Sequence, residues 1–515
     1  MNDTAISQPP AGLLAAGVDK LVNLSWTQTL ALGLALLIIL DQVSYLRNKG
    51  SIAGPRFKMW PIMGPFLESM DPKFEEYEAK WRSGALSCVS VFHKFVVIAS
   101  TRDLARKVLN SPAYVRPCVV DVAIKLLRPT NWVFKDGKDH QEYRKALNPL
   151  FTKQAIAQYL PAMEECYDYY LEEFLRLSLE SKGPRPYMHE FREINCANSL
   201  RVFCGRYISD DQVKDISDNY YKVTAALELV NFPIILPFTK TWYGKKITDM
   251  TMDIFEQCAQ ASKDHIAAGG SVDCTMDAWV KEMADERAAA VGGKKVREFT
   301  NREISETIFT FLFASQDATS SATTWLFQII ADRPEIMQKV REEQIRVRGG
   351  NPSVPLSVDL VDSMEYTYMV VKEALRYRPP VSMVPYVVKK SFPITPEYSA
   401  PKGAMLIPTL HPSMHDPEVY DNPEEFIPER WLPGSKANKA LTNWLVFGSG
   451  PHICLGQRYV MLHLVGLMGK ACMLYDWKHT VTPKSEVIRV FATIFPDDDC
   501  ILEFRKRSPE EIVAV

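Results

Sequence analysis

The sequence predicts a mainly α-helical fold with a small β region, preceded by one N-terminal transmembrane helix. Three observations support this prediction: an uncharged stretch long enough to cross a bilayer, a long region with apolar residues at three- and four-residue spacing, and a later region rich in proline and β-branched residues. The predicted segments are a lumenal N-terminus (1–20), a transmembrane anchor (21–40), a basic hinge rich in proline and glycine (41–66) and one large body (67–515).

The anchor is the stretch from Leu21 to Leu40, whose twenty uncharged residues span about 30 Å as a helix. A cleaved signal peptide is the main alternative, but no basic segment precedes the stretch and no small-residue cleavage site follows it. The basic residues on its body side are Arg47, Lys49, Arg56 and Lys58. The positive-inside rule therefore places the body in the cytosol.

Three stretches of the body have informative local patterns. The β-branched runs 86–92 and 95–98 predict a hairpin. The segment from Ile304 to Ile330 predicts the longest helix, and because it is apolar nearly all round, it should lie in the middle of a large domain. The segment 230–238 is apolar and broken by two prolines, so it either dips into a membrane surface or forms a buried connection.

The composition argues against several functional classes. With 47% hydrophobic and 24% charged residues, the 515-residue chain is neither disordered nor of low complexity. The 60 Lys and Arg residues balance 62 Asp and Glu residues, so there is no overall positive field to bind nucleic acid. The ten cysteines are scattered without a C-x-x-C pair, which excludes zinc ribbons and disulfide scaffolds and favours a reducing compartment.

The most informative segment is the glycine-rich loop from Phe447 to Gly456, which contains Cys454. A thiolate that ligates a metal needs backbone N–H groups directed at the sulfur, and glycines such as Gly448 allow that close approach. Residues 457–472 have helical apolar spacing, so the sulfur also lies near a helix N-terminus, where the dipole favours an anion. For the other nine cysteines, a small buried hydrophobe is the simpler interpretation.

The chain resembles the cytochrome P-450 family. The loop matches the family's haem-binding pattern F-x-x-G-x-x-x-C-x-G, and three further motifs occur in the order that the family has them. They are Ala314 to Thr319 in the place of the oxygen-activating motif, Glu373-Ala-Leu-Arg376, which is similar to E-x-x-R, and Pro428-Glu-Arg430-Trp431, which is similar to P-E-R-F/W. The resemblance covers essentially everything after the hinge, and it implies that residues 67–515 fold as one mainly helical catalytic domain with a small sheet.

The resemblance also implies cofactors and partners. It implies a haem b whose iron is ligated by the Cys454 thiolate, together with O2 and electrons from NADPH. The electrons would come through a flavoprotein, NADPH–cytochrome P-450 reductase, with cytochrome b5 as a second candidate donor; exposed Lys138, Lys436 and Lys439 are candidate contacts for such acidic partners. Together with the anchor, this predicts a single-pass protein of the endoplasmic reticulum membrane, in contact with membrane lipid, whose catalytic domain is cytosolic.

Several of the family's haem contacts are altered in this chain. His452 stands where most members carry an arginine that pairs with a haem propionate, and Tyr386 stands where a second arginine is common. The family's W-x-x-x-R becomes His140 to Arg144. Because weaker donors replace bidentate ones, Arg144 is expected to carry more of the haem anchoring. The further candidate haem contacts are His140, Tyr386, His452, Phe447 and Gly448.

The oxygen-activating helix also departs from the family pattern, because Ala318 occupies the place of the usual threonine. Thr319 is rotated by about 100° on the helix, whereas Ser315, three residues before Ala318, shares its face. Ser315 is therefore a candidate hydroxyl for proton delivery, with Asp317 as a relay from solvent and Thr319 as the other candidate. Alternatively, Ser315 bonds its own helix backbone, as serines within helices often do.

Within the family, the segment from Phe311 to Ala318 and the Pro-His-Ile-Cys sequence of the loop resemble the fungal branch that desaturates sterol side chains at carbons 22 and 23 in ergosterol biosynthesis. We therefore expect an oxidoreductase that acts on a sterol. Two alternatives stay open: a sterol or lipid hydroxylase of the same family, which product analysis would separate, and a non-catalytic haem- or sterol-binding membrane protein, which substrate-dependent NADPH consumption would exclude.

Overall fold

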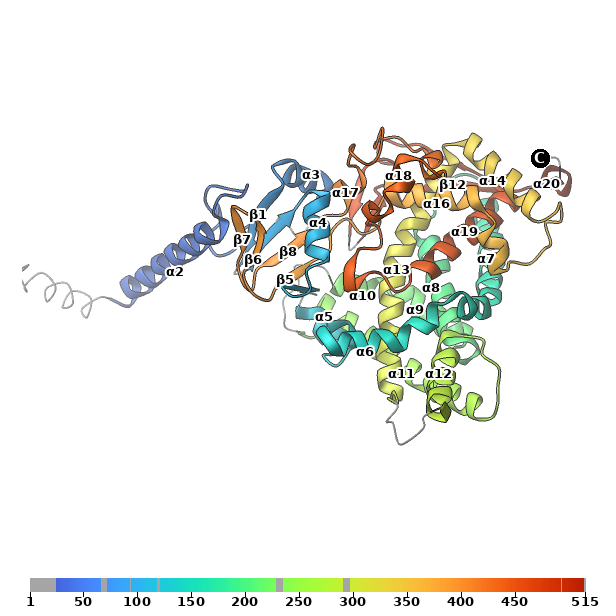
Figure 1. Cartoon of the computed structure of the whole chain (residues 1–515), viewed down its shortest axis with the longest axis horizontal. Helices are drawn as coiled ribbons and strands as arrows, with labels where there is room; N and C mark the ends of the chain where they lie inside the picture. Colours follow the sequence, from blue (N-terminus) through green and yellow to red (C-terminus); the bar gives the residue numbers. More distant parts are fainter. Residues whose placement is uncertain are drawn as a thin grey trace, which may run out of the picture.

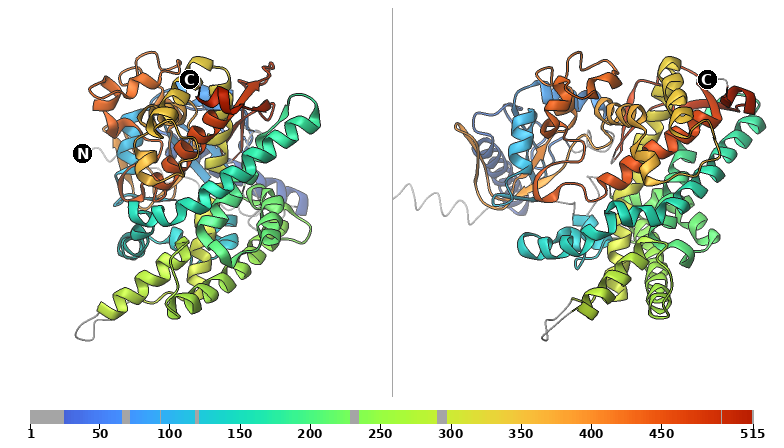
Figure 2. Two further views of the ribbon diagram at one scale, coloured as in Figure 1. Left: turned by 90° about the vertical axis from the view of Figure 1, so that its right-hand side faces the viewer. Right: turned by 45° about the vertical axis from the view of Figure 1, so that its right-hand side comes forward.

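The structure, a computed structural model, describes residues 25–65, 72–92, 94–117, 121–227, 235–289, 297–491 and 493–513. Helix α2 projects from one end of the body, next to a sheet, and the C-terminus lies near the opposite end (Figure 1). Two further views show that helices make up most of the body beyond this sheet (Figure 2). The predicted class, mainly α with a small β region, is confirmed.

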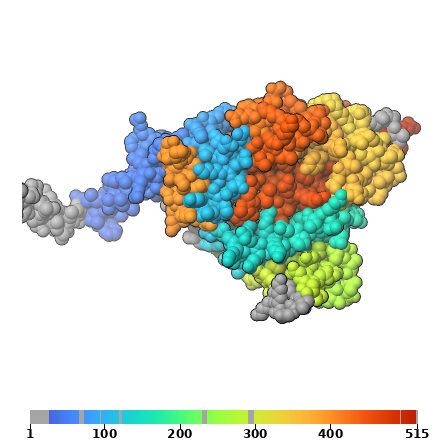
Figure 3. Space-filling model, in the orientation of Figure 1, coloured from blue at the N-terminus to red at the C-terminus, as the bar shows by residue number. Residues whose placement is uncertain are grey.

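Helix α2 (Trp26–Lys49) contains the described part of the predicted anchor. Ser25 begins the helix with a capping box, in which its side chain accepts from the N–H of Gln28 and the Gln28 side chain accepts from the N–H of Ser25. The helix is long and apolar enough to cross a membrane, and it stands clear of the body except at its end (Figure 3). The predicted lumenal segment and the first residues of the anchor lie outside the described residues.

The prediction that the hinge begins at residue 41 is wrong, because α2 continues to Lys49. This last part of the helix packs against the body: Tyr45 is buried and donates its hydroxyl to the carbonyl oxygen of Pro55 at 2.8 Å. Lys58 is buried as well, and its ammonium lies 3.0 Å from the Asp41 carboxylate. The Tyr45 ring also contacts the Phe95 ring, with centroids 6.1 Å apart, and Ala53 pairs with Ser87. Residues 41–65 are thus folded onto the sheet, and Lys58 does not contribute an exposed charge to the basic flank.

The predicted hairpin is confirmed, since β1 (Leu86–Val91) pairs antiparallel with β2 (Lys94–Ala99). In the described residues it forms one edge of a five-stranded sheet of order β1-β2-β8-β5-β3. The other strands of this sheet are β3 (Val115–Pro117), β5 (Tyr386–Val388) and β8 (Met405–Pro408). The remaining strands form three small sheets among the described residues and are β4 (Arg185–Pro186), β6 (Phe392–Thr395), β7 (Tyr398–Ala400), β9 (Tyr475–His479), β10 (Ile488–Val490), β11 (Ile494–Pro496) and β12 (Ile501–Lys506).

Most of the body is helical, which confirms the prediction from the long region with apolar residues at three- and four-residue spacing. The helices before the central one are α3 (Phe74–Arg82), α4 (Arg102–Leu109), α5 (Asp121–Leu126), α6 (Gly137–Leu147), α7 (Lys153–Ser181), α8 (Met188–Cys204), α9 (Asp210–Asn219), α10 (Tyr221–Ala226), α11 (Lys240–Ala267) and α12 (Thr275–Ala289). The later ones are α14 (Pro334–Val347), α15 (Val358–Asp362), α16 (Glu365–Tyr377), α17 (His411–Met414), α18 (Lys436–Lys439), α19 (Gln457–Leu474) and α20 (Pro509–Val513).

The longest helix, α13 (Asn301–Ala331), runs through the middle of the body, as its apolar sequence predicted (Figure 1). Thr300 begins it with a capping box to Glu303. Between Ile304 and Ile330, all but three of its side chains are buried. A helix that is covered on every side can be apolar on every face, which explains the sequence pattern.

A buried charge network joins α16 to the chain ahead of the glycine-rich loop. Glu373 and Arg376 are fully buried, and two hydrogen bonds of 2.9 and 3.0 Å connect their side chains. Arg430 donates to one oxygen of Glu373 at 2.9 Å, and the indole of Trp431 donates to the other at 3.0 Å. The two motifs, E-x-x-R and P-E-R-W, are therefore in direct contact.

Candidate functional site

Cys454 lies between the glycine-rich loop and the N-terminus of α19. Its N–H donates to the carbonyl oxygen of Phe447 at 2.9 Å, which closes the loop. The N–H groups of Gly456 and Gln457 are directed at its sulfur, and α19 begins at Gln457. Among the described cysteines, Cys454 is the exposed one, whereas the others are buried or half-buried. Desolvation raises the pKa of the Cys454 thiol, and the two N–H groups oppose that rise. The backbone donors and the helix dipole are therefore placed to stabilise a thiolate when a cationic ligand binds the sulfur.

Two positions in this loop require glycine. Gly450 has a φ of +74°, and a Cβ there would lie 2.5 Å from the carbonyl oxygen of Leu109 at the end of α4. Gly448 also has a positive φ, +75°. Nearby, the Asn110 amide donates to the Ser449 hydroxyl at 3.0 Å. The loop conformation is therefore fixed by its glycines and by close packing on α4.

Arg144, on α6, is a half-buried cation near Cys454. Burial lowers the pKa of its guanidinium, and the charge of Cys454 opposes that shift. In the described part of the chain, Arg144 has no carboxylate partner. A partly buried guanidinium without a carboxylate partner is suited to bind an anion from outside the chain, as the predicted contact with a haem propionate requires.

His452 and His140 are neighbours, with ring centroids 4.1 Å apart. Burial, together with His140, lowers the pKa of His452 to about 4. Burial and the charge of Arg144 also lower the pKa of His140. Both imidazoles are therefore neutral at pH 7 and offer N–H groups without a positive charge, which fits the expectation that they contact an anion more weakly than arginine would.

Three further residues near this pair were not predicted from the sequence. Asp136 caps α6, and its carboxylate lies 2.7 Å from the ammonium of Lys389. Trp132 stacks on His140 with ring centroids 6.0 Å apart, and its buried indole N–H has no hydrogen-bond partner among the described residues. A buried donor without a partner costs about 1–3 kcal/mol, so Trp132 is a candidate to donate to a bound group. Its position before α6 does not match the W-x-x-x-R spacing, which is why the motif did not reveal it.

Tyr386 lies apart from this group. It is buried in β5 and packs in the hydrophobic cluster of the sheet with Val97 and Leu406. Burial raises the pKa of its phenol to about 12. The structure gives Tyr386 no contact with His452 or Arg144 among the described residues, and its contact with haem stays a prediction.

One face of α13 is open in an otherwise buried helix. Ala314 is exposed, and Phe313 and Ala318 are half-buried. Ala314 and Ala318 are one turn apart, so their methyl groups lie on the same face. Two such small side chains leave room beside the helix for a bulky ligand.

The carboxylate of Asp317 does not lie on this open face. It is buried 2.7 Å from the guanidinium of Arg192 on α8, and the hydroxyl of Thr224 on α10 donates to it at 2.9 Å. Asp317 therefore links the central helix to α8 and α10. Its role as a proton relay stays a prediction.

The two candidate hydroxyls are placed differently. Ser315 donates to the carbonyl oxygen of Leu312 in its own helix at 3.1 Å, which is the bond that the alternative interpretation expected, and its hydroxyl lies 2.9 Å from that of Ser199 on α8. Thr319 is buried, and its hydroxyl has no partner among the described residues. No described hydrogen bond joins Ser315, Asp317 and Thr319 into one chain, because their side chains point to different neighbours.

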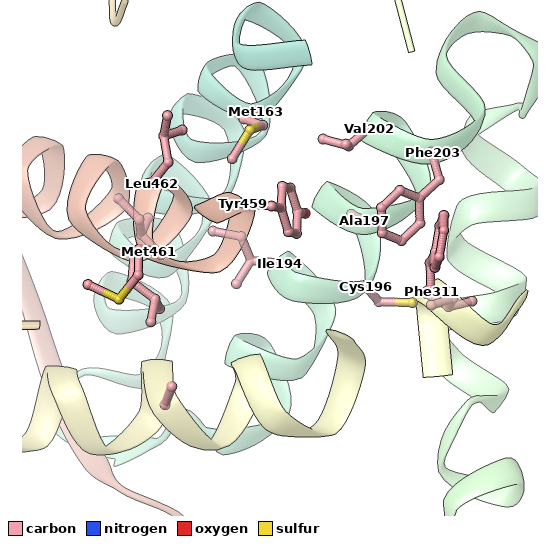
Figure 4. Packing of buried hydrophobic residues seen from close by; sticks show 14 of the residues in the cluster. Met163, Ile194, Cys196, Ala197, Val202, Phe203, Phe311, Tyr459, Met461 and Leu462 are labelled. Carbon is pink, nitrogen blue, oxygen red and sulfur yellow. The ribbon is translucent and has the colours of Figure 1, made fainter. Parts of the chain in front are cut away.

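A polar network on α8 connects α13 with α19. His463 of α19 is fully buried; its Nε2 donates to the Asn195 side-chain oxygen at 2.8 Å, and its Nδ1 accepts from Tyr167 at 3.0 Å. The amide of Asn198 donates to the hydroxyl of Tyr459 at 2.8 Å. Figure 4 shows Tyr459 next to residues of α8 in this region. The Asn195 amide in turn donates to the Thr323 hydroxyl on α13 at 3.2 Å, so α8 connects the helix that follows Cys454 to the central helix.

This network predicts a loss of stability in acid. Burial lowers the pKa of His463 to about 3, from an unfolded value near 6.5. The unfolded chain therefore takes up a proton below about pH 6.5 that the folded chain refuses down to about pH 3, so folding stability falls as the pH drops through this window. We expect His463→Gln to reduce the pH slope of the unfolding free energy below pH 6.5, by an amount that approaches about 1.4 kcal/mol per pH unit near pH 5.

The measurement is denaturant unfolding between pH 7.5 and pH 5. His189→Gln is the control, because His189 is exposed and its pKa is raised by Glu193, so its loss should not reduce the slope. An unchanged slope in His463→Gln would contradict the assignment of a neutral buried imidazole.

Comparisons with known proteins identify the relatives of this chain. The family model for cytochrome P450 matches residues 54–496. The C-22 sterol desaturase of Saccharomyces cerevisiae is 62% identical over 514 residues, which cover 99% of this chain and 96% of that protein. The C-22 sterol desaturase of Candida albicans is 63% identical, covering 92% of each chain.

A more distant likeness supports the fold alone. The structure of the retinoic acid-bound cyanobacterial CYP120A1 superposes with a TM-score of 0.74 at 20% sequence identity, covering 87% of this chain and 98% of that one. The helices and sheets described above are therefore those of an established architecture.

Proposed function

This chain belongs to the cytochrome P450 family, and from that premise we propose that it is a haem-thiolate enzyme that introduces the double bond between carbons 22 and 23 of a sterol side chain in ergosterol biosynthesis. The observation that carries the proposal is the 62% identity to a C-22 sterol desaturase over 99% of the chain. The open face at Ala314 and Ala318 supports it, because small side chains leave space for a bulky rigid substrate beside the helix.

Family membership implies a haem with a cysteine thiolate ligand, and O2. We propose Cys454 as that ligand, with Arg144, His140 and His452 as donors to the haem carboxylates. The donor set fits, because Cys454 is exposed beside two N–H groups and Arg144 has no carboxylate partner in the described chain. When bound, the haem supplies the oxidising chemistry that removes hydrogen from an unactivated carbon.

The reaction balances as a four-electron reduction of oxygen. One sterol with a saturated C22–C23 bond, one O2, one NADPH and one proton give the alkene, two waters and NADP⁺. The chain's own part is to exclude bulk water, to hold the side chain beside Ala314 and Ala318, and to deliver protons. A hydroxylase would instead leave an alcohol and one water.

Product analysis tests this proposal. Cells that lack the protein should accumulate sterols with a saturated C22–C23 bond, and the purified protein with a reductase should convert 22,23-dihydroergosterol to ergosterol. An alcohol as the sole product would favour the hydroxylase, and the absence of any sterol-dependent NADPH consumption would favour a non-catalytic binding protein.

We further propose that NADPH–cytochrome P-450 reductase, with cytochrome b5 as a second donor, delivers the electrons on the face that carries Cys454. Lys138 and Lys439 are exposed, as a docking role requires, whereas the ammonium of Lys436 already lies 2.7 Å from the Asp421 carboxylate. Salt-dependent reduction rates that respond to charge reversal at Lys138 and Lys439 would support this site.

The location proposed is the endoplasmic reticulum membrane, with the body in the cytosol. Beside α2, the segment after the helix exposes apolar side chains, among them Met59 and Trp60. Most of the apolar loop predicted at 230–238 lies outside the described residues, but Leu236 and Phe238 are exposed. Both groups support additional contacts with lipid.

Removal of residues 1–40 is expected to release the protein from membranes at least in part, since it deletes most of the exposed apolar helix but keeps the buried contact of Tyr45. Salt and carbonate washing of membrane fractions measures this. A second truncation with Phe238→Ser should release more protein than the first. If both truncated proteins stay tightly bound, α2 is not the main anchor.

Ser315→Ala tests the proposed proton delivery. The variant should keep its sterol affinity but consume NADPH to form hydrogen peroxide and water instead of alkene, because general acid assistance is typically worth about a hundredfold. The ratio of ergosterol formed to NADPH oxidised measures this coupling. Thr319→Ala is the control: if it uncouples while Ser315→Ala does not, the displaced hydroxyl is assigned to the wrong residue.

A further inference from the structure

The hairpin β10–β11 is hydrogen-bonded to α13 close to Ala318, one of the two alanines on the open face of that helix. The hydroxyl of Thr493, in the turn of this hairpin, donates to the carbonyl oxygen of Asp317 at 3.3 Å. One residue further on, the carbonyl oxygen of Ile494 accepts from the indole of Trp325 at 3.1 Å and from the hydroxyl of Ser321. All these side chains are buried, so the contacts are shielded from water.

Among the described residues, no hydroxyl side chain of α13 bonds the Asp317–Ala318 peptide, and that of Thr319 has no partner. Ser315 and Ser320 both donate to carbonyl oxygens of their own helix, at 3.1 and 2.6 Å. Position 318 is alanine, in the place of the threonine that is usual in the family. Among the described residues, the side-chain hydroxyl that bonds the Asp317–Ala318 peptide therefore comes from Thr493, on a different element.

The hairpin contacts the Asp317–Ala318 peptide directly through Thr493 and contacts the Asp317 side chain indirectly through Arg192. On one side, the Asp317 carboxylate binds Arg192 at 2.7 Å. The same guanidinium lies over the ring of Phe495, 5.9 Å from its centroid, and Phe495 is two residues from Thr493. On the other side, Thr493 binds the Asp317 carbonyl oxygen. A shift of the hairpin turn would therefore move the peptide that carries Ala318 on the open face.

We propose that Thr493 is a positioning residue for the reaction: its hydroxyl, donated from the hairpin, orients the Asp317–Ala318 peptide and with it the part of α13 that carries Ala318. The inference rests on the proposed function, since it concerns how oxygen reduction is coupled to sterol oxidation. It holds whichever side chain transfers the proton, because Thr493 acts through the peptide. Thr493 does not touch substrate or cofactor in this role.

The test compares Thr493→Val, which keeps the shape of the side chain but removes the donor, with Thr493→Ser, which keeps the donor. A buried hydrogen bond between neutral groups contributes about 0.5–1.5 kcal/mol, so Thr493→Val should lower the ratio of ergosterol to NADPH oxidised by about 2- to 12-fold. Thr493→Ser should restore the ratio to near that of the unchanged protein. Thr493→Ala serves as the second donor-free variant should the valine variant not fold.

Ser321→Ala is the matched control, because it removes a bond to the same hairpin without touching the Asp317 carbonyl. We expect normal coupling in Ser321→Ala, and in Thr493→Val an unchanged dissociation constant for 22,23-dihydroergosterol and an unchanged midpoint of thermal unfolding relative to Ser321→Ala. Equal uncoupling in Thr493→Val and Ser321→Ala, failure of Thr493→Ser to restore coupling, or a change confined to sterol affinity would each overturn the inference.

Failure of the positioning role of Thr493 can be distinguished from failure of the proposed function. If the unchanged protein forms no ergosterol from 22,23-dihydroergosterol, the proposed function fails before any variant is compared. If the unchanged protein forms ergosterol and Thr493→Val couples as well as it does, the positioning role fails alone.

Discussion

Replacing Cys454 by serine is expected to remove the thiolate signature from the reduced carbon-monoxide spectrum and to abolish sterol desaturation. A serine hydroxyl stays protonated at neutral pH, so it cannot supply the anionic ligand that the N–H groups of Gly456 and Gln457 are placed to stabilise. Cys166→Ser is the control, since burial raises the pKa of Cys166 to about 12 and it lies on α7.

The readout is the spectrum of the purified protein, recorded with total haem and with the far-ultraviolet circular dichroism that reports folding. Cys166→Ser should keep the signature. A normal signature in Cys454→Ser would transfer the axial role to another cysteine and remove the basis of the proposed site.

Replacing Glu373 by glutamine is expected to destabilise the protein by about 3–5 kcal/mol, because it leaves the positive charges of Arg376 and Arg430 buried without their carboxylate. That is a large part of the stability of a typical domain, so little folded protein should accumulate. Denaturant unfolding and the yield of haem-bound protein measure the effect.

Glu429→Gln is the matched control for the charge network. Glu429 is adjacent to Arg430, but its carboxylate is half-exposed and pairs with Lys339, so its loss should cost less than about 1 kcal/mol. Comparable losses in the two variants would mean that the buried pair is not the element that holds α16 to the segment before the loop.

The features that the sequence predicted correctly are those with a local cause. The hairpin at Leu86 to Ala99 follows from two β-branched runs, and α13 follows from the apolar segment between Ile304 and Ile330. The contact between Glu373 and Arg430 was implied by the family resemblance rather than by spacing, since an i,i+3 pair such as Glu373 and Arg376 occurs on many helices.

The sequence by itself determined the class of fold, the family and the cysteine of the candidate loop, because short motifs and helical periodicity record local geometry. Only the tertiary structure decided which partners the polar side chains take: Tyr45 packs on the body, Asp317 binds Arg192, and Ser315 bonds its own helix. The tertiary structure also identified Trp132 as a candidate donor to a bound group and Thr493 as a candidate positioning residue. Each of these side chains could bond either its own element or a neighbouring one. Because hydrogen bonds act over about 3 Å, the packed positions of the helices determine which of these bonds forms.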